Sequence, residues 1–199
     1  MSNTKTLPPS KLAHVVLKTN FLDRQTQFYC NFLGARVVYD GPFMKLMTYD
    51  DEHHRIAVVQ LPETTPKDHQ SSGLMHIAFT FDSLSDLCKA YRQRKEVGIT
   101  PGWCVNHGPT TSMYYQDVDG NQLETQVDNM TPEEATAYME TEQYNNNVFG
   151  RDFDPEELCT ALERGEEEAE LMKIGEVGPR GMEAAPEIDA MMKRGTVGV

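Results

Sequence analysis

The feature of this sequence that most constrains its fold is a weak internal repeat. One copy begins with the apolar run 11–17 and the other with the apolar run 73–79. Each run carries a histidine at its fourth position, so that His14 and His76 lie 62 residues apart. Short apolar runs rich in β-forming residues are typical of buried strands. The repeat therefore indicates two copies of one structural unit that begins with a strand.

A helix and three further strands follow in each copy. Apolar spacing predicts helices over 23–33 and 83–96, and a glycine that can stop a helix, Gly34 or Gly98, follows each one. Asp119-Gly120 predicts a hairpin turn, because glycine accepts positive φ without steric cost. The pattern is βαβββ twice, joined by a polar linker over 62–72, with the further strands predicted at 35–39, 43–49, 55–61, 99–105, 111–117 and 122–127.

Two such units can pair their sheets into one curved, open barrel of the α+β class. His14 and His76 would then face each other across its concave side, and Glu124 would lie beside the strand of His76. Two imidazoles and one carboxylate leave other metal positions open, which suits non-haem Fe(II), although Zn, Mn, Ni and Co accept the same ligands. A lone strand histidine is more often a core or surface residue. Two histidines at matching repeat positions, together with a glutamate on an apolar strand, favour a metal site.

These segments resemble the vicinal-oxygen-chelate superfamily over residues 11–128. Within it they are similar to the small one-module type I extradiol dioxygenases related to biphenyl-2,3-diol 1,2-dioxygenase. The stretch 111–124, TSMYYQDVDGNQLE, matches the family's ending, in which a tyrosine, a glycine turn and the glutamate ligand come at a set spacing. The resemblance implies that the metal ligands are His14, His76 and Glu124.

The same resemblance implies roles for three further residues. Tyr114 and His107 would hydrogen-bond the substrate or the oxygenated intermediate beside the metal. His54, in the segment His53-His54-Arg55, would be the acid–base residue, since an imidazole has a pKa near operating pH. The alternative for this histidine pair is an exposed turn. The implied cofactor is Fe(II), with Mn(II) as the alternative, and the implied substrates are an aromatic diol and O₂.

One rival function is that of a glyoxalase-type isomerase or lyase. Such enzymes usually draw a fourth protein ligand, often a glutamate, from the last strand of the first copy. Here Val58 and Val59 occupy that stretch, and Gln60 has the wrong alternation if Val59 faces inward. Three ligands with open positions therefore favour oxygenase chemistry.

A second rival is a thiol transferase or a drug-binding resistance protein of the same fold. A pure binding module would not need acid–base residues around the metal ligands. Phe43, Trp103 and Met113 suit either the wall of a pocket for a flat aromatic substrate or ordinary core packing.

The sequence carries a net charge of −13, most of it in the last third. Residues 1–128 hold 14 acidic and 12 basic residues, whereas residues 129–199 hold 17 acidic and 6 basic ones. Such acidity disfavours nucleic acid and anionic membranes as partners. The division predicts three parts, which are an N-terminal extension over 1–10, a module over 11–128 with units 11–61 and 73–128, and an acidic C-terminal extension over 129–199.

The C-terminal extension is predicted to be partly helical. Thr131-Pro132 and Asp154-Pro155 are typical of helix starts, whereas residues 144–147 predict a loop. We expect the extension to pack over the barrel or over a neighbouring subunit.

The sequence start lacks the apolar core of a secretory leader, and no apolar run approaches about 18 residues. The four cysteines form no CxxC pattern and are typical of thiols that stay reduced. We therefore expect a cytoplasmic protein. Homo-oligomers are common among soluble proteins, and we therefore expect this protein to form a homo-oligomer.

Overall fold

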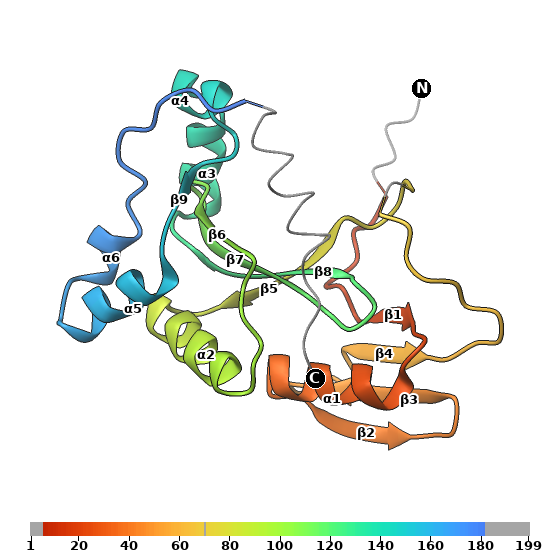
Figure 1. Ribbon diagram of the computed structural model, residues 1–199. Helices are drawn as coiled ribbons and strands as arrows, with labels where there is room; N and C mark the ends of the chain where they lie inside the picture. The colour runs from red at the N-terminus through yellow and green to blue at the C-terminus, as the bar shows by residue number, and fades with distance from the viewer. Residues whose placement is uncertain (1–5, 70, 182–199) are drawn as a thin grey trace, which may run out of the picture. The chain divides into compact units, whose positions relative to one another are not determined.

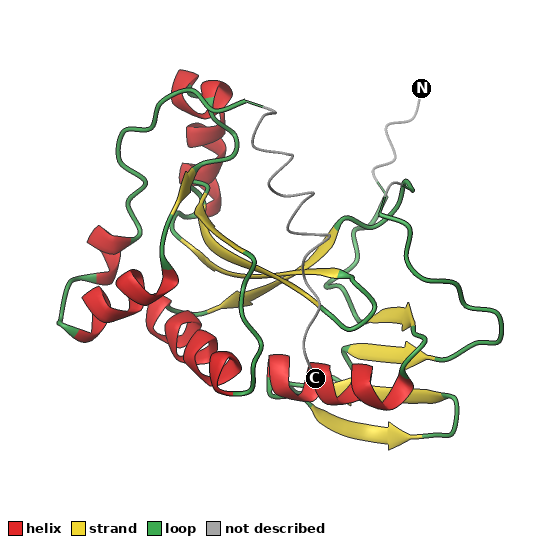
Figure 2. Cartoon of the chain, viewed as in Figure 1, coloured by secondary structure: helices red, strands yellow, loops and turns green. Residues whose placement is uncertain are grey.

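The computed structural model describes residues 6–69 and 71–181 (Figure 1). The chain divides into two compact units, Met1–Pro66 and Lys67–Val199. The boundary falls inside the polar linker that the sequence predicts. Each unit has its own sheet and at least one helix, which Figure 2 colours yellow and red.

The N-terminal unit has the predicted order βαβββ. Its sheet runs β1-β4-β3-β2, with β1 parallel to β4 and the other pairs antiparallel. The helix α1 packs on β3 and β4. The elements are β1 (Val15–Lys18), α1 (Leu22–Leu33), β2 (Arg36–Asp40), β3 (Met44–Thr48) and β4 (Ile56–Val59).

The C-terminal unit repeats this order and adds one short strand. Its sheet runs β5-β8-β7-β6-β9, and β5 is parallel to β8. The elements are β5 (His76–Phe81), α2 (Leu84–Glu96), β6 (Trp103–Asn106), β7 (Thr110–Gln116), β8 (Gln122–Asp128) and, from the extension, β9 (Arg151–Asp152).

The two sheets have matching registers. Val16 pairs with Ala57 across β1 and β4, and Ala78 pairs with Glu124 across β5 and β8. The first members of these pairs lie 62 residues apart, the same separation as the two repeat histidines. The predicted repeat is therefore confirmed in three dimensions, and each position in one sheet has a defined counterpart in the other.

Both helices pack an apolar stripe on their own sheet. Phe28 and Phe32 of α1 are buried with ring centroids 5.4 Å apart, and Leu84 and Leu87 of α2 are fully buried. Burial of each such side chain stabilises the fold by about 1.5–3 kcal/mol. The helix α1 ends at Gly34, whose φ of 63° is a backbone conformation that glycine adopts readily.

Two predicted strand starts lie several residues later in the structure. β1 begins one residue after His14, and its first ladder bond runs from Val15 N to Arg55 O (3.0 Å). β6 begins at Trp103 instead of residue 99, because Ile99 N still bonds to Arg94 O of α2 (2.9 Å). Pro101 has no N–H group and cannot donate to a strand ladder.

The extension is partly helical, as predicted. Thr131 starts α3 (Pro132–Met139) with a capping box, and Asp154 caps α5 (Pro155–Glu163). The prediction of a loop over 144–147 was wrong, because α4 (Glu142–Asn146) covers most of it, and its cap Thr141 accepts from Tyr144 N (3.2 Å).

The extension packs on the βαβββ part of the C-terminal unit. The helix α5 contacts α2, and β9 pairs with β6. In α6 (Glu168–Leu171) the carboxylate of Glu168 accepts from the backbone N–H groups of Leu84 and Ser85, both at 3.1 Å. These contacts join the extension to the N-terminus of α2. In the part of the chain that the structure describes, no helix has the length and apolar character needed to cross a membrane.

Candidate functional site

A row of polar and aromatic side chains crosses the sheet of the C-terminal unit. Glu124 of β8 pairs in register with Tyr114 of β7, and Tyr114 pairs with Trp103 of β6. Residues in register on neighbouring strands project from the same face. His76 lies two residues before Ala78, the partner of Glu124, and therefore shares this face.

The central contact of the row is between His76 and Glu124. The Nε2 atom of His76 lies 3.0 Å from Oε2 of Glu124, whose residue is only 5% exposed. The hydrogen bond that His76 donates to Glu124 raises the pKa of His76 above its ordinary value. Burial tends to raise the pKa of Glu124, but hydrogen bonds from His76, Ser112 and Tyr114 outweigh it and lower that pKa. The carboxylate is thus held ionised.

Tyr114 and His107 continue the polar network from this pair. The Nε2 atom of His107 lies 3.1 Å from the hydroxyl of Tyr114. Burial raises the pKa of Tyr114, and the charge of Glu124 adds to that shift, so the phenol stays protonated. Burial lowers the pKa of His107, although Glu124 and the carbonyls of Val148 and Phe149 oppose the change. A neutral phenol and a neutral imidazole share one hydrogen bond at this contact.

The N-terminal unit holds a second cluster, made of three histidines. The rings of His14 and His54 have centroids 4.2 Å apart, and the Nδ1 atoms of His53 and His54 lie 2.6 Å apart. His14 and His53 are exposed, whereas His54 is half-buried. Burial, followed by the charges of His14 and His53, lowers the pKa of His54. The pair is thus not a fully exposed turn, since the ring of His54 packs beside the ring of His14.

The structure brings the predicted site residues together in two groups. His76, Glu124, Tyr114 and His107 meet in the C-terminal unit, whereas His14 and His54 meet in the N-terminal unit. Among residues 6–69 and 71–181, no three His, Cys, Asp or Glu side chains gather as a metal site. The pair of His76 and Glu124 is an ionised oxygen donor beside an imidazole, a donor set that fits a divalent first-row metal.

Sequence reasoning missed Ser112, whose hydrogen bond lowers the pKa of Glu124. Strand alternation could have found it, because Ser112 lies two residues before Tyr114 on β7 and therefore faces the same side. Sequence reasoning also left open whether Trp103 lines a pocket or packs in the core. In the structure its ring stacks on Tyr114, with ring centroids 4.9 Å apart. Of the other two aromatic-pocket candidates, Met113 is fully buried and Phe43 is 56% exposed.

The matching registers identify the counterpart of Glu124 in the N-terminal unit. That counterpart is Ala57, since it pairs with Val16 as Glu124 pairs with Ala78. Ala57 is buried and has no group that could bind a metal. The N-terminal sheet therefore supplies no carboxylate at the repeat-equivalent position, in agreement with the valines that follow it in sequence.

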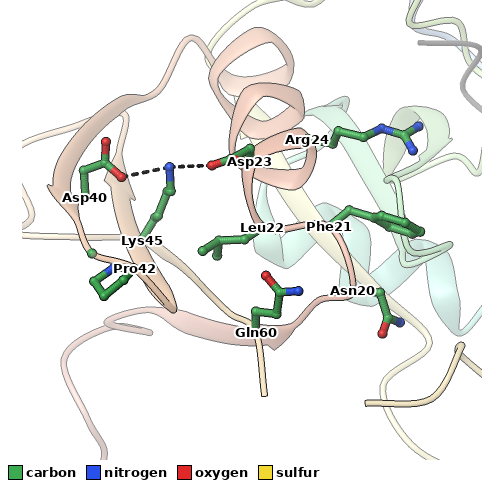
Figure 3. A pocket seen from close by; sticks show the side chains of 10 residues that line it. Asn20, Phe21, Leu22, Asp23, Arg24, Asp40, Pro42, Lys45 and Gln60 are labelled. Carbon is green, nitrogen blue, oxygen red and sulfur yellow. Dashed lines mark ion pairs between the residues drawn. The ribbon is translucent and has the colours of Figure 1, made fainter. Parts of the chain in front are cut away.

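A cavity of about 780 Å³ opens in the N-terminal unit, but its lining includes none of the predicted site residues. Lys45 lies in it between two carboxylates, with Nζ 2.7 Å from Asp23 and 2.8 Å from Asp40 (Figure 3). Both contacts raise the pKa of Lys45, that with Asp23 more strongly. Two carboxylates thus compensate the ammonium charge, and the cavity offers no unpaired cation at this point.

Comparison with known proteins identifies the family. Residues 11–125 match the family described as "Glyoxalase/Bleomycin resistance protein/Dioxygenase superfamily". The chain is 48% identical to "Biphenyl-2,3-diol 1,2-dioxygenase 3" of Rhodococcus globerulus over 81% of this chain and 86% of that protein. It is 45% identical to "Biphenyl-2,3-diol 1,2-dioxygenase 2" of the same organism, over 78% and 83% of the two chains.

A solved structure supports the fold. A glyoxylase/bleomycin resistance protein/dioxygenase domain from Frankia sp. EAN1pec superposes with a TM-score of 0.52 at 18% identity, covering 61% of this chain and 99% of that one. At 18% sequence identity, this similarity supports the fold alone. Together with the paired βαβββ units and the family match over more than half of the sequence, it leads to one conclusion. The chain belongs to the glyoxalase/bleomycin resistance protein/dioxygenase superfamily.

Proposed function

We propose that this chain is an extradiol ring-cleaving dioxygenase that opens a catechol-type aromatic diol with O₂. The substrate class is that of 2,3-dihydroxybiphenyl. A divalent metal, Fe(II) in the first instance and Mn(II) as the alternative, would be held by His14, His76 and Glu124. When bound, such a metal binds the diol and makes its hydroxyl groups more acidic.

One observation carries the proposal. The ionised Glu124, paired with His76 and in register with Tyr114, occurs in a chain that shares 48% identity with a protein named as a biphenyl-2,3-diol dioxygenase. The buried carboxylate fits the metal, because burial of an ionised group is costly unless a partner charge or a metal compensates it. The alanine at the repeat-equivalent position of Glu124 argues against the four-ligand arrangement of the glyoxalase-type rival.

The other polar residues have roles that follow from their chemistry. His54 would accept a proton from the substrate diol and return it later in the reaction, as a general base and then acid. The Tyr114 hydroxyl would donate a hydrogen bond to an oxygen of the substrate. His107, 3.1 Å from that hydroxyl, would keep it oriented. His54 would thus move the proton, whereas Tyr114 and His107 would orient the diol.

The test is metal analysis of anaerobically purified protein, combined with oxygen uptake on 2,3-dihydroxybiphenyl and on catechol. We expect about one iron per chain, oxygen consumption and a yellow ring-opened product. Glu124→Ala should lose both metal and activity, because a metal ligand is gone. Zinc or nickel without oxygen uptake would instead favour an isomerase or lyase, and protein that binds no metal would refute the ligand set.

His54→Ala separates the acid–base role from metal binding. This variant should keep the metal and lose turnover by about 10²-fold or more, the usual range for a general acid–base residue. The matched control is His69→Ala, a histidine outside both clusters, which should retain wild-type metal content and rate. Full turnover in His54→Ala would show that another group moves the proton.

A further inference from the structure

Trp103 links the C-terminal extension to the polar row. Its ring stacks on Tyr114, with centroids 4.9 Å apart and planes 25° apart. Its indole Nε1 donates to Oδ1 of Asp152 at 2.9 Å. Asp152 belongs to β9, which pairs antiparallel with β6 at the edge of the sheet (Figure 1). The extension therefore binds the one polar atom of a side chain that covers the Tyr114 ring.

Asp152 is itself fixed by a second residue of the extension. Arg180 donates from Nη1 and Nη2 to the two carboxylate oxygens of Asp152, at 2.7 and 2.9 Å. Paired contacts of this kind fix the plane of a carboxylate as well as its distance. Burial tends to raise the pKa of Asp152, but the hydrogen bonds from Arg180 and Trp103 lower it. The acceptor for the indole is thus an oriented, ionised carboxylate.

The extension also reaches His107. The backbone of Val148 and Phe149 partly opposes the lowering of the pKa of its imidazole by burial, so this segment lies beside the ring. The ring of His107 also meets that of Trp103 edge-on, with centroids 5.5 Å apart. His107 therefore borders both the backbone of the extension and the indole that donates to Asp152.

The close approach of this segment requires its particular residues. Gly150 has φ of 78°, and a Cβ atom there would lie 2.1 Å from the backbone oxygen of Asn106. The side chain of Asn147, only 2% exposed, bonds both to the N–H (2.8 Å) and to the carbonyl (3.1 Å) of Gly150. A third hydrogen bond of this side chain, from Asn147 Nδ2 to Gly178 O (3.0 Å), joins the segment to a later part of the extension. Hydrogen bonds of the Asn147 side chain therefore hold the bend at residues 147–150 in place.

From these contacts we infer that the C-terminal extension is part of the active site, with Asp152 as a positioning residue that acts through Trp103 on Tyr114 and His107. The inference rests on the proposed dioxygenase function. The described contacts of Asp152 include none of the three proposed metal ligands, so it acts on the orientation of other groups and not on metal binding. The extension would thus set the geometry of the two residues that hydrogen-bond the substrate.

The experiment compares Asp152→Ala, Asp152→Asn and the matched control Glu166→Gln in the full-length, iron-loaded enzyme. Glu166→Gln removes one exposed charge from the same extension. The readouts are metal content, kcat and KM on 2,3-dihydroxybiphenyl, and acrylamide quenching of tryptophan fluorescence. Trp103 is the only tryptophan of the chain, so its fluorescence reports this contact alone.

We expect Asp152→Ala to keep its metal, to lower kcat about tenfold with little change in KM, and to make Trp103 more accessible to acrylamide. This loss is smaller than the roughly 10²-fold cost of a 1 Å misplacement at a reacting centre. Asp152→Asn keeps an oxygen acceptor for the indole and should recover a good part of kcat. A purely structural role would not give this recovery together with an unchanged KM.

Wild-type kcat and KM in Asp152→Ala, beside an active parent enzyme, would overturn the inference and leave the proposed function intact. An inactive parent enzyme would refute the proposed function itself, and this inference with it, before any variant is compared. If Asp152→Ala fails to fold, Trp103→Phe takes its place, because it keeps an aromatic ring beside Tyr114 but removes the indole N–H that donates to Asp152. Unchanged kcat in Trp103→Phe would then overturn the inference.

Discussion

At the scale of single residues, Arg55 joins two segments of the N-terminal unit. Its Nη1 donates to the carbonyls of Leu12 (2.7 Å) and Ala13 (3.0 Å), directly before His14. Its Nε and Nη2 both lie 2.9 Å from the carboxylate of Asp50. These hydrogen bonds hold the pKa of Asp50 at about 2, so the carboxylate stays ionised at neutral pH. Arg55 therefore fixes the backbone from which His14 projects.

Arg55→Lys should weaken metal binding about tenfold, the lower end of the range for residues that orient a metal ligand. A lysine ammonium has no planar fork, so it cannot reach two carbonyls and a carboxylate together. Metal affinity is measured by competition with a chelator. The control is Arg36→Lys, since Arg36 donates to the backbone of Asp50 but not to residues 12 and 13. Unchanged affinity in Arg55→Lys would mean that His14 does not depend on this contact.

At the scale of elements, one carboxylate joins α5 to α2. Glu156 accepts from the hydroxyl of Tyr91 and from Nζ of Lys95, both at 2.6 Å, and lies 3.2 Å from Nη2 of Arg92. The hydrogen bond from Lys95, followed by that from Tyr91, lowers the pKa of Glu156 below its ordinary value of 4.5. A carboxylate with a lowered pKa in the folded state stabilises the fold above its ordinary pKa, and this stabilisation is lost as pH falls through the folded value.

Glu156→Gln should therefore lower the Tm at pH 7, by roughly 2–4 °C. The difference from wild type should shrink steadily below pH 4.5, because the wild-type carboxylate then also loses its charge. Thermal unfolding followed by circular dichroism across this pH range measures both effects. Glu157→Gln, on the same helix turn but exposed, is the control for the helix dipole. A pH-independent difference would mean that packing, and not charge, joins the two helices.

Sequence patterns predicted the elements of the repeat better than those of the extension. The spacing of apolar residues and the glycines that end the helices located α1 and α2 to within one residue. Both helices are specified by contacts within one unit. The helix α4 escaped prediction because its single turn depends on side-chain hydrogen bonds, such as Asn145 Nδ2 to Thr141 O (2.9 Å), in a stretch of poor helix formers. β9 has only two residues, and no periodicity can reveal a strand that short.

The candidate site shows the same division. His76 and Glu124 could be found from the repeated strand pattern, and Tyr114 from the resemblance of residues 111–124 to the family's ending. Asp152 and the bend that Asn147 supports could not, because they come from the extension and meet the sheet only through folding. A long-range contact of this kind leaves no spacing in the sequence from which it could be predicted.

At the scale of the whole molecule, two copies of one unit carry very different chemistry. In the C-terminal sheet the row reads Trp103, Tyr114 and Glu124 across β6, β7 and β8. Its counterpart across β2, β3 and β4 of the N-terminal sheet is Tyr39, Leu46 and Ala57. The repeat thus keeps the backbone in both copies, whereas only the C-terminal row has a carboxylate, and Leu46 stands where that row has the hydroxyl of Tyr114. A substitution in one copy therefore has a natural control in the other.

Tyr114→Phe and Tyr39→Phe each remove one phenol oxygen, from opposite copies. We expect Tyr114→Phe to keep its metal and to lose about 10²-fold in kcat, because the oxygen that meets His107 and would contact the substrate is gone. Tyr39→Phe should stay within about twofold of the wild type, since its 46% exposed ring lies in the row that lacks a carboxylate. Steady-state oxygen uptake and metal analysis of both variants measure this. Equal losses would show that both rows serve the reaction, and metal loss in Tyr114→Phe would make its phenol part of the metal site.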